Sequence, residues 1–107
     1  MSLDVSLRIP GTEQVWAGNI THNLGAMAEA AGLYQALWRP EDIGCTTAQD
    51  LAPFLRRGLA VLTAAPRRFK VFNPVNGWGN YEGLVSLTRD YLRACEEYPH
   101  ARLRASR

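Results

Sequence analysis

The stretch SLDVSLRI at residues 2–9 decides the fold class, because its polar and apolar side chains alternate without a break. Successive side chains of an extended chain point to opposite faces, so this pattern predicts a strand with one buried and one solvated face. Pro10 and Gly11 follow directly and are expected to end the strand. Proline cannot donate to a strand ladder, and glycine permits the turn that comes next.

Two further segments are predicted to be strands. Residues 14–18, QVWAG, are expected to return as the second strand of a hairpin, and residues 101–106 alternate alanine or leucine with arginine or serine. We expect the first and last strands to be neighbours in a small antiparallel sheet with one apolar face. The opposite face would meet water or a partner, and it carries Asp4, Arg8, Arg102 and Arg104.

Helices are predicted between the second and third strands, from apolar residues that recur at helical spacing. The expected ranges are 22–31, 47–64 and 81–97, with a short helix over 66–72 and a further turn over 33–38. The resulting order, β-β-α-α-α-β, is typical of an α+β domain in which three to four helices pack on the apolar face of a small sheet.

The long middle helix has two possible N-terminal registers. Thr46 and Gln49 have the spacing of a capping-box pair, and Thr47 with Asp50 is the competing register. Pro53 falls in the first turns of this helix and deletes one backbone hydrogen bond. We expect the helix to continue through it, and the alternative is that the helix begins at Pro53.

Size and composition predict one domain over residues 1–107. A chain of 107 residues falls within the usual length of a single domain. Its 47% apolar and 21% charged residues are ordinary for a globular protein and exclude a largely disordered chain. No apolar run approaches the roughly 18 residues of a membrane span, so we expect a cytoplasmic protein without a membrane partner.

No metal site or cofactor is expected. Cys45 and Cys95 lie far apart, and neither belongs to a Cys-x-x-Cys pair or lies near a histidine in the sequence. This spacing argues against a zinc site and a redox motif, and it favours two reduced thiols. The chain also lacks the glycine-rich phosphate loops and the nucleophile and metalloprotease motifs that are typical of enzymes.

Charge is distributed unevenly along the chain, although its net value is only +2. Residues 51–81 contain no acid and five cations: Arg56, Arg57, Arg67, Arg68 and Lys70. One hypothesis is therefore a weak polyanion or nucleic-acid binder that uses the basic segment 56–70. The alternative is a solvated helix surface. The small net charge favours this alternative and argues against nucleic acid as a partner.

His22 and Asn23 follow Thr21, which can cap the start of the first predicted helix. Free backbone N–H groups and the helix dipole attract anions at such a position. A small polar or anionic ligand, or a side chain of a protein partner, is therefore expected here, with His22 as a donor or proton carrier. The alternative is that His22 caps or packs locally and does no chemistry.

The stretch NGWGNYE at residues 76–82 is the most site-like part of the chain. Two glycines flank Trp78 in a predicted loop, and such a loop can bring backbone and an aromatic face close to a ligand. Asn76 and Glu82 are expected to add polar groups to the same site, and Asn80 to cap the last helix. The alternative is that Trp78 fills the core and Glu82 only balances the helix dipole.

Four groups of residues form a familiar combination: ITHNLG at 20–25, LWRPE at 37–41, NGWG at 76–79 with Tyr81-Glu82, and Tyr91-Leu92 with Ala94-Cys95 and Tyr98-Pro99. Through them, residues 2–107 resemble a family of small α+β proteins of unknown function from bacteria and their phages. The resemblance implies an intracellular single domain and a mobile-element origin. It implies no activity, and no catalytic residue carries over from it.

The leading hypothesis is a non-enzymatic, cytosolic binding module that exists as a monomer or homodimer. Its ligand-binding residues are predicted to gather where two helices begin, and they are His22, Asn23, Asn76, Trp78 and Glu82. This hypothesis requires His22 and Trp78 to lie within about 10 Å and to line one pocket. The alternative is a small enzyme with His22 as general acid or base, which requires His22 to reach Glu82 directly or through one water.

Overall fold

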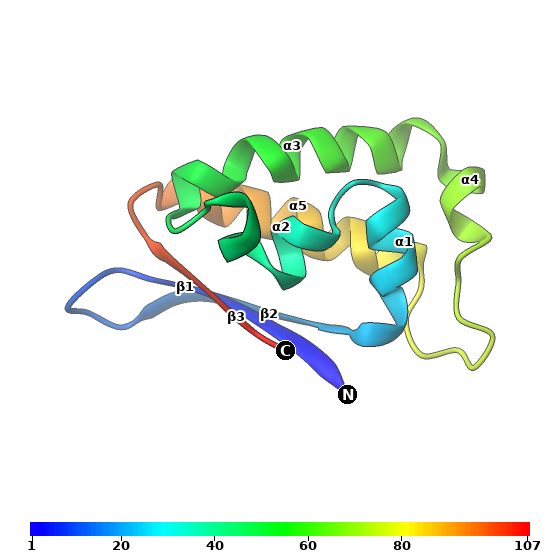
Figure 1. Cartoon of the computed structure of the whole chain (residues 1–107), viewed down its shortest axis with the longest axis horizontal. Coiled ribbons are helices and arrows are strands. Elements are labelled where there is room, and N and C mark those ends of the chain that lie inside the picture. The colour runs from blue at the N-terminus through cyan, green and yellow to red at the C-terminus, as the bar shows by residue number, and fades with distance from the viewer.

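The computed structural model describes residues 1–107 and has a three-stranded antiparallel sheet with its helices gathered on one side (Figure 1). The strands are β1 (Ser2–Arg8), β2 (Gln14–Thr21) and β3 (Arg102–Ser106). Their order in the sheet is β2-β1-β3, so the first and last strands are neighbours. The predicted α+β fold and the order β-β-α-α-α-β are confirmed.

The register of the sheet separates a buried face from an open face. Leu3, Val5 and Leu7 of β1 are almost fully buried beneath the helices. The positions between them face the other way, where no helix lies (Figure 1). The open face consists of Ser2, Asp4, Ser6 and Arg8 from β1, Gln14, Ala17, Asn19 and Thr21 from β2, and Arg102, Arg104 and Ser106 from β3.

Five α-helices and two short 3₁₀ turns connect β2 to β3. The turns are η1 (His22–Leu24) and η2 (Pro40–Ile43), and the helices are α1 (Gly25–Ala30), α2 (Tyr34–Trp38), α3 (Ala48–Ala64), α4 (Pro66–Lys70) and α5 (Tyr81–Glu97). The two long helices, α3 and α5, pack side by side above the sheet (Figure 1).

Helix α5 lies against β2 and is tied to α3. The ring of Trp16 stacks on that of Tyr91 with centroids 4.7 Å apart. Gly18 permits this close approach, because a β-carbon there would lie 2.7 Å from the side chain of Leu87. At the start of α5, the Tyr81 hydroxyl donates to the Leu62 carbonyl over 2.7 Å. The loop before α5 therefore ends at a fixed point.

The first helical segment differs most from its prediction. The sequence predicts one helix over 22–31, whereas the structure has turn η1 followed by the six-residue helix α1. The prediction of a continuous helix is wrong because Thr21 caps only the amide of Asn23, and Gly25 then stands at the junction with a poor helix propensity. Gly32, with a φ of +75°, lies just beyond the end of α1.

Strand β2 extends beyond its predicted end. The sequence predicts a strand that stops at Gly18, but the structure continues it to Thr21. Ile20 pairs with Leu3 and is buried, so the same alternation that defines β1 continues through this segment. The end of β2 therefore belongs to the sheet and positions the residues that follow it.

Smaller differences affect the connections between helices. Residues 40–43 form turn η2, because Pro40 at the first position has a φ suited to a helix. Helix α4 ends at Lys70, short of the predicted end at 72. Helix α3 runs through Pro53 without a break, as predicted.

The start of α3 follows the register of Thr47 with Asp50. Asp50 Oδ2 accepts hydrogen bonds from the backbone N–H groups of Thr46 over 3.1 Å and Thr47 over 3.2 Å. The prediction that Thr46 and Gln49 form the capping box is therefore wrong. The backbone N–H of Gln49 instead donates to the Pro99 carbonyl over 2.9 Å, which joins α3 to the turn before β3.

The core is one cluster of 28 buried apolar residues between the sheet and the helices. Thr88 is the only buried polar residue, and its hydroxyl donates to the Leu84 carbonyl over 2.8 Å within α5. A single contiguous cluster fits a single domain. None of the helices combines the length and the apolar character that crossing a membrane requires.

Candidate functional site

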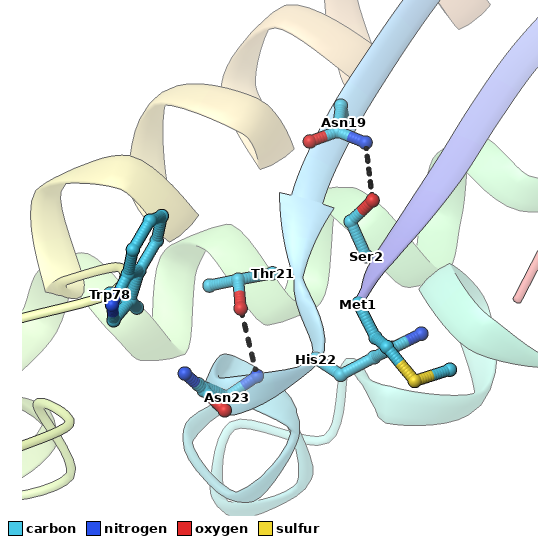
Figure 2. Close-up of a pocket in the computed structure, with 7 residues that line it drawn as sticks. All are labelled: Met1, Ser2, Asn19, Thr21, His22, Asn23 and Trp78. Atoms are coloured by element: carbon cyan, nitrogen blue, oxygen red, sulfur yellow. Dashed lines mark hydrogen bonds between the residues drawn. The ribbon is translucent and has the colours of Figure 1, made fainter. Parts of the chain in front are cut away.

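A pocket of about 600 Å³ lies where the sheet meets turn η1 and the loop before α5 (Figure 2). Three of the predicted site residues, His22, Asn23 and Trp78, line this one pocket. Other polar side chains of the lining come from the end of the open face formed by β1 and β2. The full lining is Met1, Ser2, Asn19, Thr21, His22, Asn23 and Trp78.

The half-buried His22 is held in place by Trp38. Its Nδ1 accepts a hydrogen bond from the indole Nε1–H of Trp38 over 2.8 Å. Nδ1 is therefore unprotonated, and the neutral ring carries its proton on Nε2, where it can be donated to a ligand. Trp38 is only 3% exposed and stacks on Tyr34 with ring centroids 5.2 Å apart. A buried aromatic pair thus fixes the orientation of the imidazole.

The backbone amides beside His22 already have acceptors. Thr21 Oγ1 accepts from the N–H of Asn23 over 3.2 Å, and the N–H of His22 donates to the Met1 carbonyl over 3.4 Å. Turn η1 has three residues, so few peptide dipoles add up along it. The expected cradle of free amides is not formed, and a ligand here meets the side chains of His22 and Asn23.

Trp78 stands on one side of the pocket, with Met1 and Ser2 on the other (Figure 2). Its side chain is 70% exposed, so the alternative that it fills the core is wrong. Asn76 Oδ1 accepts a hydrogen bond from the backbone N–H of Trp78 over 3.0 Å. This bond holds the turn that carries the indole, although the indole itself faces solvent.

Gly79 brings this loop against the end of β2. Its φ of +94° lies in the region that favours glycine. A β-carbon at this position would lie 2.5 Å from Thr21 Cγ2 and 3.0 Å from Leu24 Cγ. Only glycine permits so close an approach, and the approach places the neighbouring Trp78 at the pocket.

Two predicted site residues, Asn76 and Glu82, lie outside the lining of the pocket. Asn76 acts on the site only by holding the turn at Trp78. Glu82 forms an ion pair with Lys70 over 3.5 Å. The enzyme hypothesis needs Glu82 to reach His22, but each of the two has a different partner, so the contacts give no support to a catalytic pair.

Ser2 and Asn19 also line the pocket, although nothing in the local sequence marks them as site residues. Asn19 Nδ2 donates to Ser2 Oγ over 3.0 Å and to Asp4 Oδ1 over 2.6 Å. Both residues reach the pocket through the register that pairs Ser2 with Thr21. The signal that could have found them is the alternation that continues beyond Gly18 to Thr21.

Acids of α5 partly neutralise the basic segment 56–70. Arg56 pairs with Glu96 over 3.1 Å, and Lys70 pairs with Glu82 over 3.5 Å. The other three arginines of the segment form no ion pair, and two of them lie over phenylalanine rings. Such an arrangement is typical of a solvated helix surface with a modest excess of positive charge.

Neither cysteine fits a metal site or a nucleophile. Cys45 and Cys95 are free and buried, and no group of three ligand-type side chains is placed to hold a metal. Burial raises the pKa of the Cys95 thiol to about 12. Burial, with a smaller effect of Asp50, also raises the pKa of Cys45 above its usual value. Both thiols are therefore protonated at neutral pH, and the thiolate is the reactive form.

Comparisons with family models, with curated proteins and with solved structures gave no match.

Proposed function

We propose that the protein is a non-enzymatic binding module whose pocket takes a small uncharged ligand with a flat ring and polar edges. The observation that carries this proposal is the pocket that joins the exposed indole of Trp78 to the fixed imidazole of His22. The indole offers an apolar face to a ring, and the imidazole Nε2–H offers a directed donor to its edge. Two free thiols support a reducing compartment such as the cytosol.

The rest of the lining can hydrogen-bond in both directions. The hydroxyls of Ser2 and Thr21 and the amides of Asn19 and Asn23 each donate and accept. No arginine, lysine or carboxylate side chain lines the pocket, so its side chains favour a neutral ligand. A nucleobase is a flat ring of this kind, and a sugar ring can instead place its apolar C–H face on the indole; both have edges rich in donors and acceptors.

The size and the order of the pocket favour specific binding. Its volume of about 600 Å³ lies within the range of roughly 300–1,000 Å³ that small-molecule sites occupy. Trp38 holds the imidazole, and Asn76 and Gly79 hold the loop of the indole. Because the imidazole and the backbone of this loop are already held in place, ordering them on binding costs little conformational entropy.

Nuclear magnetic resonance with defined probes tests this function. Isotope-labelled protein is titrated separately with thymidine, adenosine, glucose and N-acetylglucosamine. We expect at least one probe to shift the indole N–H resonance of Trp78 together with resonances of His22 and Asn23, in a saturable manner. The absence of such a joint shift with every probe at millimolar concentration would contradict the proposed function.

Two variants of the same loop separate binding from folding. Trp78→Ala removes the exposed face and is expected to abolish the shifts of the His22 and Asn23 resonances with little change in melting temperature, since the side chain is 70% exposed. Val75→Ala is the matched control, because Val75 is 107% exposed and lies outside the lining. If the two variants bind the probe equally well, Trp78 is not part of the binding site.

A further inference from the structure

The open face continues from the pocket toward the hairpin turn, and its far end carries three arginines. The register places Arg8 directly opposite Arg102, and Arg104 opposite Ser6. None of these arginines forms an ion pair. Like charges opposite one another on neighbouring strands are unfavourable. This end of the sheet therefore holds unbalanced positive charge that an anion would neutralise.

A second pocket joins two of these arginines to the rest of the open face. It has a volume of about 360 Å³, and its lining includes Arg8, Arg104 and Asp4. Asp4 pairs with Asn19 in the register, and Asn19 lines the first pocket together with Ser2. The two pockets therefore adjoin along β1 and β2, and together they form one polar track.

We propose that the polar track binds a short single strand of nucleic acid, with one base on Trp78 and backbone phosphates at Arg8, Arg102 and Arg104. This inference rests on the proposed function of the pocket and names its ligand class. Guanidinium groups match phosphate oxygens with paired hydrogen bonds. A basic groove combined with base stacking on aromatic rings is how proteins hold single strands without reading their sequence.

The length of the polar track argues for a chain ligand. Ser2 and Arg8 lie at opposite ends of β1, which corresponds to about 20 Å at roughly 3.3 Å per residue. One nucleobase or sugar occupies only the end at Trp78. Neighbouring nucleotides of the same strand would extend along β1 and bring phosphates to the arginines.

The surface suits a nucleic acid better than an acidic peptide. An extended peptide usually adds to the edge of a sheet through main-chain hydrogen bonds and places side chains in apolar pockets. The polar track lies on the face of the sheet, where Ala17 is the only apolar residue among the paired positions. Its hydroxyl and amide groups are of the kind that contact sugars and phosphates.

Asp4 is the one acid on the polar track, and it lies between the two ends. Asn19 Nδ2 donates to its carboxylate over 2.6 Å. A phosphate is repelled at this point, so we expect the sugar or base of the bound strand to lie over Asp4. Removing the charge with Asp4→Asn should therefore strengthen binding of the strand.

Fluorescence anisotropy of a short fluorescein-labelled oligothymidylate tests the proposal on the intact protein. We expect salt-dependent binding that Arg8→Ala/Arg104→Ala weakens about tenfold or more, with a salt slope smaller by about 1.4, because each phosphate contact on a single strand contributes about 0.7. Trp78→Ala should weaken it about tenfold as well, because one stacked base is lost. The double arginine variant is expected to keep the melting temperature, since both side chains are exposed and a like-charge pair is relieved.

Arg67→Ala/Arg68→Ala on α4 is the charge-matched control and should bind like the unaltered protein. If this control loses binding while Arg8→Ala/Arg104→Ala retains it, the anion site belongs to the basic segment and the proposal is overturned. Binding of a labelled polyglutamate peptide as tight as that of the oligothymidylate would overturn it too.

The outcomes separate this proposal from the function of the pocket. If thymidine or a sugar shifts Trp78 but the oligothymidylate binds no more tightly than thymidine, the polar track is not a nucleic-acid site and the pocket function stands. If no small probe shifts Trp78 and the oligothymidylate does not bind, both proposals fail.

Discussion

At the scale of single residues, the hydrogen bond from Trp38 to His22 connects the core to the pocket. Replacing His22 with alanine leaves the indole N–H of Trp38, in a side chain that is 3% exposed, without an acceptor. We expect His22→Ala to lower the free energy of unfolding by about 1–3 kcal/mol, because a buried donor keeps its desolvation cost when its partner is lost. Urea unfolding measures the change.

A double-variant cycle is the control for this bond. Trp38→Phe removes the donor along with part of the indole, so the combined variant His22→Ala/Trp38→Phe no longer buries an unpaired N–H. Its loss of stability should be smaller than the sum of the two single losses. Additive losses would show that the two side chains do not depend on each other.

The carboxyl group of Asp50 makes the stability of the folded protein depend on pH in the acid range. Hydrogen bonds from the backbone of Thr46 and Thr47 lower the pKa of its carboxyl below the usual 3.8. The pKa of Asp50 is lower in the folded than in the unfolded protein, so its ionised carboxylate stabilises the fold. This stabilisation is fully present above the unfolded-state pKa of about 3.8 and is lost as the pH falls through the folded-state pKa. We expect Asp50→Asn to flatten the acid decline of the melting temperature in that range.

Asp90 provides the comparison for Asp50. It is exposed, and its only ion pair is a 4.0 Å contact with Arg93 on the same helix. Asp90→Asn should therefore retain the acid decline of the unaltered protein. If the melting temperature of Asp50→Asn falls with acid as steeply as that of the unaltered protein, the Asp50 carboxylate does not stabilise the fold through these hydrogen bonds.

At the scale of elements, the loop before α5 depends on one glycine for its position. Gly79→Ala puts a β-carbon 2.5 Å from Thr21 Cγ2 and forces a φ of +94° on a residue that disfavours it. We expect it to destabilise the protein by more than the about 1–2 kcal/mol that a left-handed conformation alone costs. Probe binding should weaken because Trp78 moves. Chemical unfolding and titration measure the two effects.

Gly77 is the matched control in the same loop. Its φ is +78°, but a β-carbon there meets no atom within 4 Å. Gly77→Ala should therefore show only the conformational penalty, and it should keep more of the binding. A loss in Gly77→Ala as large as that in Gly79→Ala would contradict the role assigned to the contact with Thr21.

Elements were predictable where local pattern and tertiary packing agree. The helix over 81–97 appears with its predicted bounds, because its apolar stripe is buried and Asn80 Oδ1 accepts from the N–H of Gly83 over 2.8 Å. The helix over 22–31 was not predictable in detail, since the same apolar spacing fits both a continuous helix and a 3₁₀ turn followed by a short helix.

At the scale of the whole molecule, the local sequence identifies only some of the residues that line the pocket. His22, Asn23 and Trp78 stand out in the sequence because of their residue types and their flanking residues. Ser2 and Asn19 join them only through the register of the sheet, which becomes visible once the end of β2 is known. For the same reason, the sequence could not show that Asn76 and Glu82 lie outside the lining.

The closed core predicts that both thiols are protected in the folded protein. Cys45 is 4% exposed and Cys95 is 1% exposed, and burial raises the pKa of each. We expect neither to react with an aromatic disulfide reagent at mildly alkaline pH until urea unfolds the chain, when both react together. Rapid reaction of either thiol in the folded protein would contradict the burial of Cys45 and Cys95 in the core.

Intermolecular nuclear Overhauser effects between the protein and bound thymidine test most directly whether His22 and Trp78 serve one site. The expected result is contact from the thymine ring to the indole protons of Trp78 and to the imidazole protons of His22 in the same complex. Contacts to Trp78 alone, or to a surface away from both rings, would contradict a shared binding pocket.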